Sequence, residues 1–187
     1  MEVSGLPSAW FTAFMGLGGA AIGFASTRSI GNFIAGLYIL ASHPFMVGDY
    51  IRIDGFEGIV REITINYTKL LTPSGNTILM NNQEILGKNI INFRLEGGGV
   101  KYCYSFEISF DHSIPTNRLH EIFDDIIDKY SGILPRKPEY TALSMDRSEK
   151  TYIFYMYFND PEEIFTIQPR FLDDIMAAWD DARLRFI

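Results

Sequence analysis

The chain has 187 residues, which is enough for one or two small domains beside a membrane segment. Its net charge is −7, with 23 acidic and 16 basic residues, and this balance argues against nucleic acid as the main partner because phosphate binding needs clustered Lys and Arg. The single Cys103 excludes an intrachain disulfide, and no Cys/His spacing is typical of zinc, so we expect no metal and no other cofactor.

The amino-terminal part of the sequence predicts a membrane helix. Between Val3 and Gly48 the only Asp, Glu, Lys or Arg is Arg28. Residues 9–27 would form about 28 Å of uncharged helix at about 1.5 Å per residue, enough to cross the hydrocarbon core. Small residues recur there at spacings of three and four, and they are Gly16, Gly19, Ala20, Gly23 and Thr27. Such a strip lets membrane helices approach closely, so we expect this helix to pack against copies of itself and other spans to precede it.

Residues 29–43 predict an amphipathic helical segment at the membrane interface. Its larger apolar side chains share one helical face, made of Ile30, Phe33, Ile34, Leu37, Leu40 and Ala41. The residues that face away are Asn32, Gly36 and His43. Pro44 ends the segment, because proline lacks an N–H group and disfavours a helical residue before it. The alternative is a membrane hairpin that turns at Arg28.

Residues 48–96 alternate with period two and predict a small all-β domain. The pair Asp54-Gly55 predicts a tight turn, and Pro73-Ser74-Gly75-Asn76 predicts another. Four or five short strands in about 45 residues suggest a strongly bent sheet or an open, Sm-like barrel. The edges of such a sheet need to be covered, which favours assembly with neighbouring copies. The acidic residues expected in its turns are Asp49, Asp54 and Glu57.

Residues 97–187 predict an α+β domain that follows a glycine linker at residues 97–99. The expected elements are a strand at 100–110, a helix at 116–130, strands at 140–146 and 151–159, and a helix at 168–186. The order βαββα is typical of a two-layer sandwich of ferredoxin-like type.

Several motifs together resemble one protein family. The run Gly19-Ala20-Ala21-Ile22-Gly23-Phe24-Ala25 is similar to the pore helix of the small-conductance mechanosensitive channel (MscS) family, and Ser29–Asn32 with Gly36 resembles that helix after its kink. Residues 43–50, His43-Pro44-Phe45-Met46-Val47-Gly48-Asp49-Tyr50, resemble the Arg-Pro-Phe-x-x-Gly-Asp/Glu junction of the family. Further similar segments are Gly58–Ile63, Thr68, Thr72–Asn76, Met80–Asn82 and Asn89–Phe93. The motifs cover residues 15–93, and the remainder is similar in architecture.

The resemblance implies a homoheptameric channel that opens under membrane tension and releases ions and small solutes during hypo-osmotic shock. It implies a kinked pore-lining helix within residues 1–47, a ring of β domains over residues 48–96, and a cytoplasmic vestibule formed by residues 97–187. The expected location is the cell (inner) membrane, with the β and α+β domains in the cytoplasm. The expected partners are lipid, permeating solutes and further copies of the chain, with no role for nucleic acid.

The sequence also departs from the family pattern. The two transmembrane helices that precede the pore helix in the family are absent, as is the carboxy-terminal segment that leads to a small barrel, so we expect a truncated chain. Ala20 and Phe24 stand where the constricting rings of the family usually carry Leu. Arg28 stands at the kink, where Gly is common, and Asn81 replaces a proline.

These positions form the candidate site. Ala20 and Phe24 are the predicted pore constriction, since a ring of Phe side chains would exclude water by dewetting; the alternative for Phe24 is a lipid-facing or packing aromatic. Arg28 is either a ring of positive charge that favours anions at the pore mouth or an interfacial anchor. Asn32 is either a second polar residue at the mouth or a packing hydrogen bond. The predicted helix-packing residues are Ala13, Gly16, Leu17, Gly19, Ala21, Gly23 and Gly36.

Two other classes of function were weighed. An enzyme is disfavoured because neither His112 nor His120 has a Ser or Cys nucleophile with an orienting partner in the sequence pattern, and no phosphate-binding glycine loop is present. The stronger alternative is a non-conducting, membrane-anchored oligomeric binding module that uses the β and α+β domains to hold partners.

Overall fold

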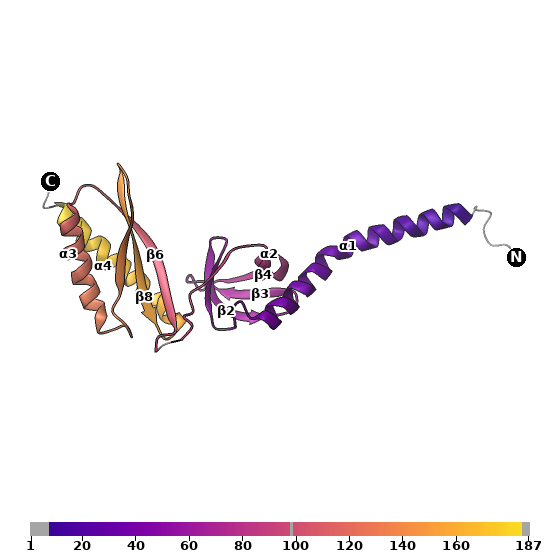
Figure 1. The fold of residues 1–187 in the computed structure, drawn as a ribbon, viewed down its shortest axis with the longest axis horizontal. Helices are drawn as coiled ribbons and strands as arrows, with labels where there is room; N and C mark the ends of the chain where they lie inside the picture. Colours follow the sequence, from indigo (N-terminus) through magenta and orange to yellow (C-terminus); the bar gives the residue numbers. More distant parts are fainter. Residues whose placement is uncertain (1–7, 98, 185–187) are drawn as a thin grey trace.

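The fold is that of a computed structural model, which describes residues 8–97 and 99–184. Three parts follow one another along the long axis of the molecule: a protruding helix, a β-sheet domain and an α+β unit (Figure 1). The α+β unit lies at the end opposite to the amino terminus. The order of these parts is the order predicted from the sequence.

Helix α1 is one continuous helix from Ser8 to Ser42. The two predicted helical segments, 9–27 and 29–43, are therefore two halves of the same element, and a hairpin at Arg28 is excluded. Figure 1 shows that α1 bends along its length. The helix ends at Ser42, two residues before Pro44, and His43 leaves it with a left-handed backbone of φ 48°, so the predicted end of the helix before Pro44 is confirmed.

The carboxy-terminal half of α1 packs on the β-sheet domain through a face that combines small and polar residues with one large apolar side chain, Ile39. Ala35, Gly36 and Ile39 are buried there, and Asn32 is half-buried. The predicted apolar face points the other way and is exposed, with Ile30, Phe33, Ile34, Leu37 and Leu40. Small side chains allow a close approach of helix to sheet, and the larger apolar side chains remain available to lipid or to other copies.

The β-sheet domain is a five-stranded antiparallel sheet with the order β4-β3-β2-β1-β5. Its elements are β1 (Tyr50–Ile53), β2 (Phe56–Ile63), β3 (Tyr67–Leu71), β4 (Thr77–Asn81), the short helix α2 (Asn82–Leu86) and β5 (Ile90–Asn92). The predicted turn at Asp54-Gly55 is confirmed, since both residues have positive φ, 49° and 84°. Helix α2 was not predicted. Its side chain Ile85 joins Ile39 of α1 in the core of this domain.

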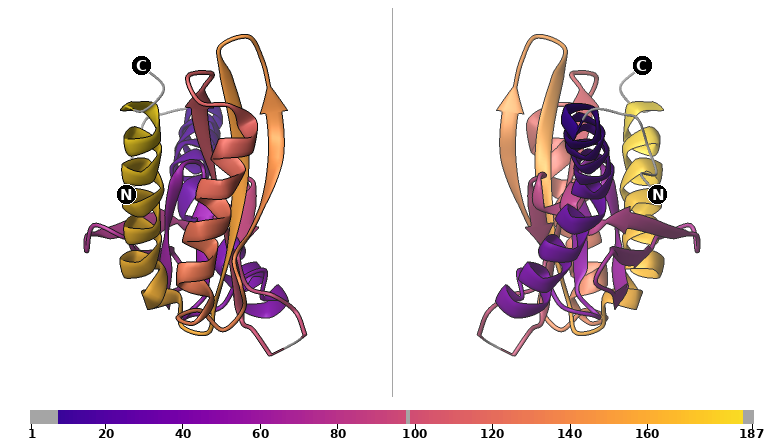
Figure 2. Two further views of the ribbon diagram at one scale, coloured as in Figure 1. Left: turned by 90° about the vertical axis from the view of Figure 1, so that its left-hand side faces the viewer. Right: turned by 90° about the vertical axis from the view of Figure 1, so that its right-hand side faces the viewer.

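The α+β unit has two layers: a three-stranded antiparallel sheet with the order β6-β8-β7, and two helices that cover one face of it (Figure 2). Its elements are β6 (Tyr102–Asp111), α3 (Thr116–Ser131), β7 (Glu139–Met145), β8 (Glu149–Phe158), η1 (Pro161–Glu163) and α4 (Ile164–Leu184). The predicted order βαββα is confirmed. The last helix begins earlier than predicted, and Phe186 at its predicted end lies outside the described residues.

The two globular parts share a hydrophobic core. Tyr50, Ile59 and Phe93 of the β-sheet domain belong to the same buried cluster as the aromatic core of the α+β unit. Tyr50 packs edge-on against Tyr104 of β6 and Phe165 of α4, with ring centroids 5.5 and 5.9 Å apart. The domains are therefore joined by packed side chains as well as by the chain itself.

Candidate pore-lining helix and its junction with the β-sheet domain

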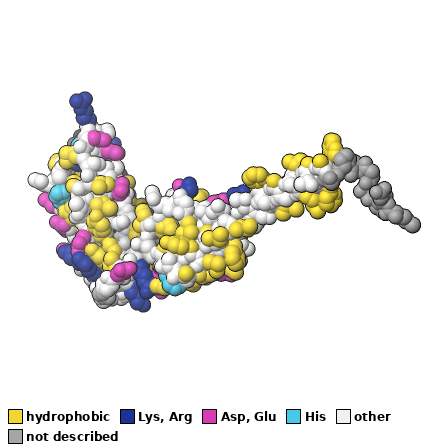
Figure 3. All heavy atoms as spheres, turned by 45° about the vertical axis from the view of Figure 1, so that its right-hand side comes forward, with side chains coloured by type: hydrophobic (Ala, Val, Ile, Leu, Met, Phe, Trp, Pro, Cys, Tyr) yellow, Lys and Arg dark blue, Asp and Glu magenta, His cyan; other side chains and the backbone are white. Residues whose placement is uncertain are grey.

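The amino-terminal half of α1 projects from the molecule, and its side chains from Ala9 to Phe24 are all exposed. Figure 3 shows hydrophobic side chains along its end, whereas charged side chains gather mainly on the part of the molecule furthest from it. By length and composition, Ala9–Ser42 could cross a membrane. A helix of this composition needs an apolar environment on its surface, because water alone would surround large exposed hydrophobic side chains.

The predicted helix-packing residues of this half form an open surface. A Cβ atom added to Gly16, Gly19 or Gly23 would meet nothing within 4 Å. The other predicted members of this surface are also exposed, namely Ala13, Leu17 and Ala21. Within one chain these residues have no packing role, so the interface that they were predicted to form stays a prediction.

Phe24 lies at the edge of a hollow where α1 meets the β-sheet domain. Its side chain is 82% exposed. The hollow has a volume of about 470 Å³ and is lined by Phe24, Thr27, Arg28, Asn32, Gln83 and Glu84. Phe24, Arg28 and Asn32 follow one another at intervals of four residues, so they share one face of α1. Ala20, the other predicted constriction residue, is one turn further out and does not line the hollow.

Arg28 is paired with an acidic residue of the β-sheet domain. An Nη atom of Arg28 lies 2.9 Å from Oε1 of Glu84 in α2, and the Asn81 side-chain amide donates to the same oxygen at 3.3 Å. Both charged side chains remain accessible, 76% and 53% exposed, so the pair stabilises the fold little. Its main effect is on charge, since Glu84 neutralises Arg28. The contact joins residues 56 positions apart in the sequence, and the two roles predicted for Arg28 stay predictions.

Asn32 makes a packing hydrogen bond, one of its two predicted roles. Its Oδ1 accepts from the backbone N–H of Gln83 at 3.2 Å. That N–H belongs to the first turn of α2, where backbone donors have no partner within the helix. Asn32 therefore caps α2 from outside and fixes α1 to it.

Gly36 lies against the backbone of the β-sheet domain. A Cβ atom on Gly36 would lie 2.0 Å from the carbonyl oxygen of Ile65 and 2.8 Å from Nδ2 of Asn82. Asn82 is fully buried and donates to the carbonyls of Thr64 and Ile65 at 2.7 and 3.0 Å, while its Oδ1 accepts from the Thr68 hydroxyl at 2.9 Å. The predicted close-packing role of Gly36 thus has a specific partner within the chain, which the sequence pattern did not identify.

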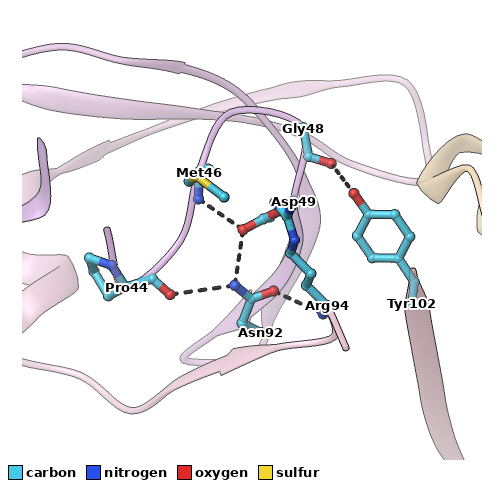
Figure 4. A network of polar contacts seen from close by, with 7 residues as sticks. All are labelled: Pro44, Met46, Gly48, Asp49, Asn92, Arg94 and Tyr102. Atoms are coloured by element: carbon cyan, nitrogen blue, oxygen red, sulfur yellow. Dashed lines mark hydrogen bonds and ion pairs between the residues drawn. The ribbon is translucent and has the colours of Figure 1, made fainter. Parts of the chain in front are cut away.

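A polar network holds the connection between α1 and β1 (Figure 4). Asp49 is only 1% exposed and was predicted to lie in an exposed turn. Its Oδ2 accepts from the backbone N–H of Met46 at 2.8 Å and from Asn92 at 3.0 Å, and its Oδ1 accepts from Arg94 at 3.0 Å. Tyr102 of β6 donates to the carbonyl of Gly48 at 3.1 Å. The carboxylate is buried because three donors, Met46 before β1 and Asn92 and Arg94 at and just after the end of β5, converge around it.

A second polar cluster joins the β-sheet domain to the α+β unit. Glu57 accepts from Arg52 at 2.8 Å and from the Tyr104 hydroxyl at 2.9 Å. Burial raises the pKa of Tyr104, and the Glu57 carboxylate raises it further. The hydroxyl of Tyr50 is buried beside them and has no hydrogen-bond partner among the residues that the structure describes. An ion pair of 2.6 Å between Arg61 and Glu162 also links the two parts.

The two histidines considered as catalytic candidates, His112 and His120, both lie in the α+β unit. His112 contacts the carbonyl of Asp146 at 2.9 Å, and His120 lies 3.4 Å from the hydroxyl of Tyr152. Burial raises the pKa of the Cys103 thiol, which disfavours the nucleophilic thiolate. Residues 8–97 and 99–184 contain no group of three or more His, Cys, Asp or Glu that could hold a metal ion.

Comparisons with known proteins agree on one family. A family model described as the β-domain of mechanosensitive ion channels matches residues 28–95. The small-conductance mechanosensitive channel MscMJ of Methanocaldococcus jannaschii is 32% identical over 126 residues, 66% of this chain and 35% of the relative. The small-conductance mechanosensitive channel of Edwardsiella ictaluri is 38% identical over 78 residues, 42% of this chain and 27% of the relative. The chain thus spans about a third of the length of these curated relatives.

Solved structures share the fold. The crystal structure of Helicobacter pylori MscS in its closed state matches with a TM-score of 0.60 and 21% identity, over 95% of this chain and 69% of that protein. A cryo-EM structure of Arabidopsis thaliana MSL1 matches with a TM-score of 0.52 and 21% identity, over 89% of this chain and 61% of that protein. At this identity the likeness concerns architecture, namely one apolar helix, a β-sheet domain and an α+β unit in the same order.

Proposed function

Because the chain belongs to the MscS family of mechanosensitive ion channels, whose β-domain model matches residues 28–95, we propose that it forms a tension-gated channel whose pore is lined by α1. Seven copies surround the pore in the cell (inner) membrane, and the β-sheet and α+β parts lie in the cytoplasm. Opening releases ions and small solutes during hypo-osmotic shock. Lipid, permeating solutes and the other copies are its partners.

One observation carries this proposal: the amino-terminal half of α1 is exposed on every side while being apolar. Large side chains such as Trp10, Phe14 and Leu17 are each more than half exposed. Lipid can cover the large side chains, and the strip at Gly16, Gly19 and Gly23 can take a neighbouring helix, because a Cβ there meets nothing. A ring of such helices encloses a narrow lumen.

Phe24 closes that lumen. In the ring, Ala20 and Phe24 point towards the axis, and the Phe24 side chains present no hydrogen-bonding group to water. A hydrophobic constriction of this kind excludes water and ions by dewetting, even where it is not completely closed by contact. Tension favours the state with the larger in-plane area, in which the helices tilt and Phe24 moves away from the axis.

The first test is the number of subunits in the complete native protein, measured by mass in nanodiscs. About seven copies support the channel, whereas a monomer or dimer leaves the glycine strip without a partner helix and favours the membrane-anchored binding module. Single-channel recording under suction follows. A protein that forms the ring but never conducts, at any tension that the membrane withstands, refutes the channel function.

The gate is tested with Phe24→Ser, which wets the constriction and lowers the tension threshold. The matched control is Phe33→Ser, because Phe33 is nine residues further along α1 and about 180° around the helix from Phe24. Both side chains are exposed in the single chain. A threshold that is unchanged by Phe24→Ser, or lowered equally by Phe33→Ser, contradicts the assignment of Phe24.

A further inference from the structure

We propose that Glu84 determines the ion preference of the pore mouth by neutralising Arg28. This inference rests on the proposed channel function and assigns a role to a residue of the β-sheet domain that the sequence pattern did not single out. With Glu84 in place the mouth carries no net charge from these two residues. Without it, every copy presents one uncompensated positive charge.

The position of the ion pair follows from the face of α1 that carries it. Phe24, Arg28 and Glu84 line the same hollow, which is open to solvent and about 470 Å³ in volume. Arg28 is four residues after Phe24, about one helical turn towards the β-sheet domain. If Phe24 faces the lumen, the Arg28–Glu84 pair therefore lies directly below the constriction, where permeating ions enter or leave.

Contacts from α1 and from the residue before α2 hold the Arg28–Glu84 ion pair in place. Glu84 lies in the first turn of α2, and its Oε1 takes hydrogen bonds from Arg28 at 2.9 Å and from Asn81 at 3.3 Å. One residue earlier, the backbone of Gln83 donates to Asn32 of α1, which keeps the two elements in register. Close contact between charges of opposite sign cancels most of their long-range field.

Arg28 and Glu84 are also the only charged residues that line the hollow within the described chain. The next charge along α2 is Lys88, whose Nζ lies 2.8 Å from Asp54 in the β1–β2 turn, so this lysine has an acidic partner of its own. Removal of Glu84 therefore leaves Arg28 without a nearby compensating carboxylate. A ring of such charges raises the local concentration of anions.

The test is the reversal potential of single channels of the complete native protein in asymmetric KCl. Glu84→Gln should raise the chloride-to-potassium permeability ratio about sevenfold, because a shift of the local potential by about one kT per unit charge favours chloride and disfavours potassium by about the same factor. Arg28→Gln should lower the ratio by a similar factor, because Glu84 then stands alone. The double variant should return to the ratio of the wild type.

Glu121→Gln is the matched control, because Glu121 also forms an exposed ion pair with an arginine, at 2.5 Å from Arg118, but in the α+β unit. It should leave the ratio unchanged. If the single variant Glu84→Gln fails to assemble, Arg28→Gln and the double variant still decide, since their ratios differ only if the Glu84 carboxylate contributes its charge at the mouth. A normally conducting channel whose ratio does not respond to these changes refutes the role of Glu84 and leaves the channel function intact. A wild-type ring that never conducts refutes the channel function itself.

Discussion

Gly36 is the residue at which α1 approaches the β-sheet domain most closely, and Gly36→Ala is the sharpest test of that contact. The added Cβ would lie 2.0 Å from the carbonyl oxygen of Ile65, whereas ordinary contact begins at 3.4 Å. The atom that it meets belongs to the backbone and cannot rotate away. Helix α1 would have to move by about 1.4 Å, or the segment at Ile65 would have to give way.

The expected change in local stability caused by Gly36→Ala follows from two opposing effects. Overpacking of this kind costs about 1–3 kcal/mol, and the shift also weakens the hydrogen bond from Gln83 to Asn32. Alanine gains about 1 kcal/mol over glycine as a helix former. We therefore expect a net loss of about 1–2 kcal/mol in the local stability of the contact, which corresponds to about a fivefold to thirtyfold change in an opening equilibrium.

Hydrogen exchange of the complete protein in detergent measures this loss directly. The backbone N–H groups to follow are those of Asn82, which donates to Asn66 at 3.2 Å, and of Gln83. Both should exchange about tenfold faster in Gly36→Ala. Gly31→Ala is the control, because its Cβ would meet the flexible end of the Gln83 side chain at 2.6 Å, which can move aside. Wild-type protection in Gly36→Ala would show that α1 does not rest on Ile65 as described.

Two further predictions concern the α+β unit and its link to the β-sheet domain. Tyr104→Phe removes the hydrogen bond to Glu57 across the two parts and should separate their unfolding transitions in calorimetry, with a loss of about 1.5–3 kcal/mol for a bond to a charged group. Tyr130→Phe is the control, because it removes a similar hydrogen bond to Asp174 within the α+β unit. It should lower the transition temperature without separating the transitions. A single joint transition in Tyr104→Phe would contradict the proposed link between the two parts. The pKa of Asp174 lies below its ordinary value because Lys129 and Tyr130 donate to its carboxylate. Its stabilising contribution is therefore complete above about pH 4 and is lost as the pH falls through the lowered pKa. Asp174→Asn should thus be less stable than the wild type at pH 7 in thermal unfolding, and the difference should shrink as the pH falls below about 4. A difference that does not shrink on acidification would refute this origin.

Local sequence signals predicted those elements whose causes are local. The Asp54-Gly55 pair predicted the β1–β2 turn because both residues tolerate positive φ, and Pro44 predicted the end of α1. Helix α2 was missed because its five residues are too few to show a helical period. Residue signals of this kind predict structure only over a short stretch of chain, about one turn or one hairpin.

Contacts between distant segments could not be predicted in the same way. Asp49 was expected in an exposed turn, yet it is buried because Asn92 and Arg94, more than 40 residues later, donate to it. Glu84 is separated by 56 residues from Arg28, and only the fold brings the two charges together. A single sequence contains the residue types for these contacts but not their pairing.

The division of α1 into a free half and an anchored half has a mechanical consequence. The free half, from Ala9 to Phe24, is exposed along its length, whereas Asn32, Gly36 and Ile39 of the anchored half lie against the β-sheet domain. The helix is continuous across Arg28, so a tilt of the free half exerts a bending force on the anchored half at this residue. The Arg28–Glu84 pair lies where the two halves of α1 meet, so a change in the tilt of the free half would change the distance between these two charges.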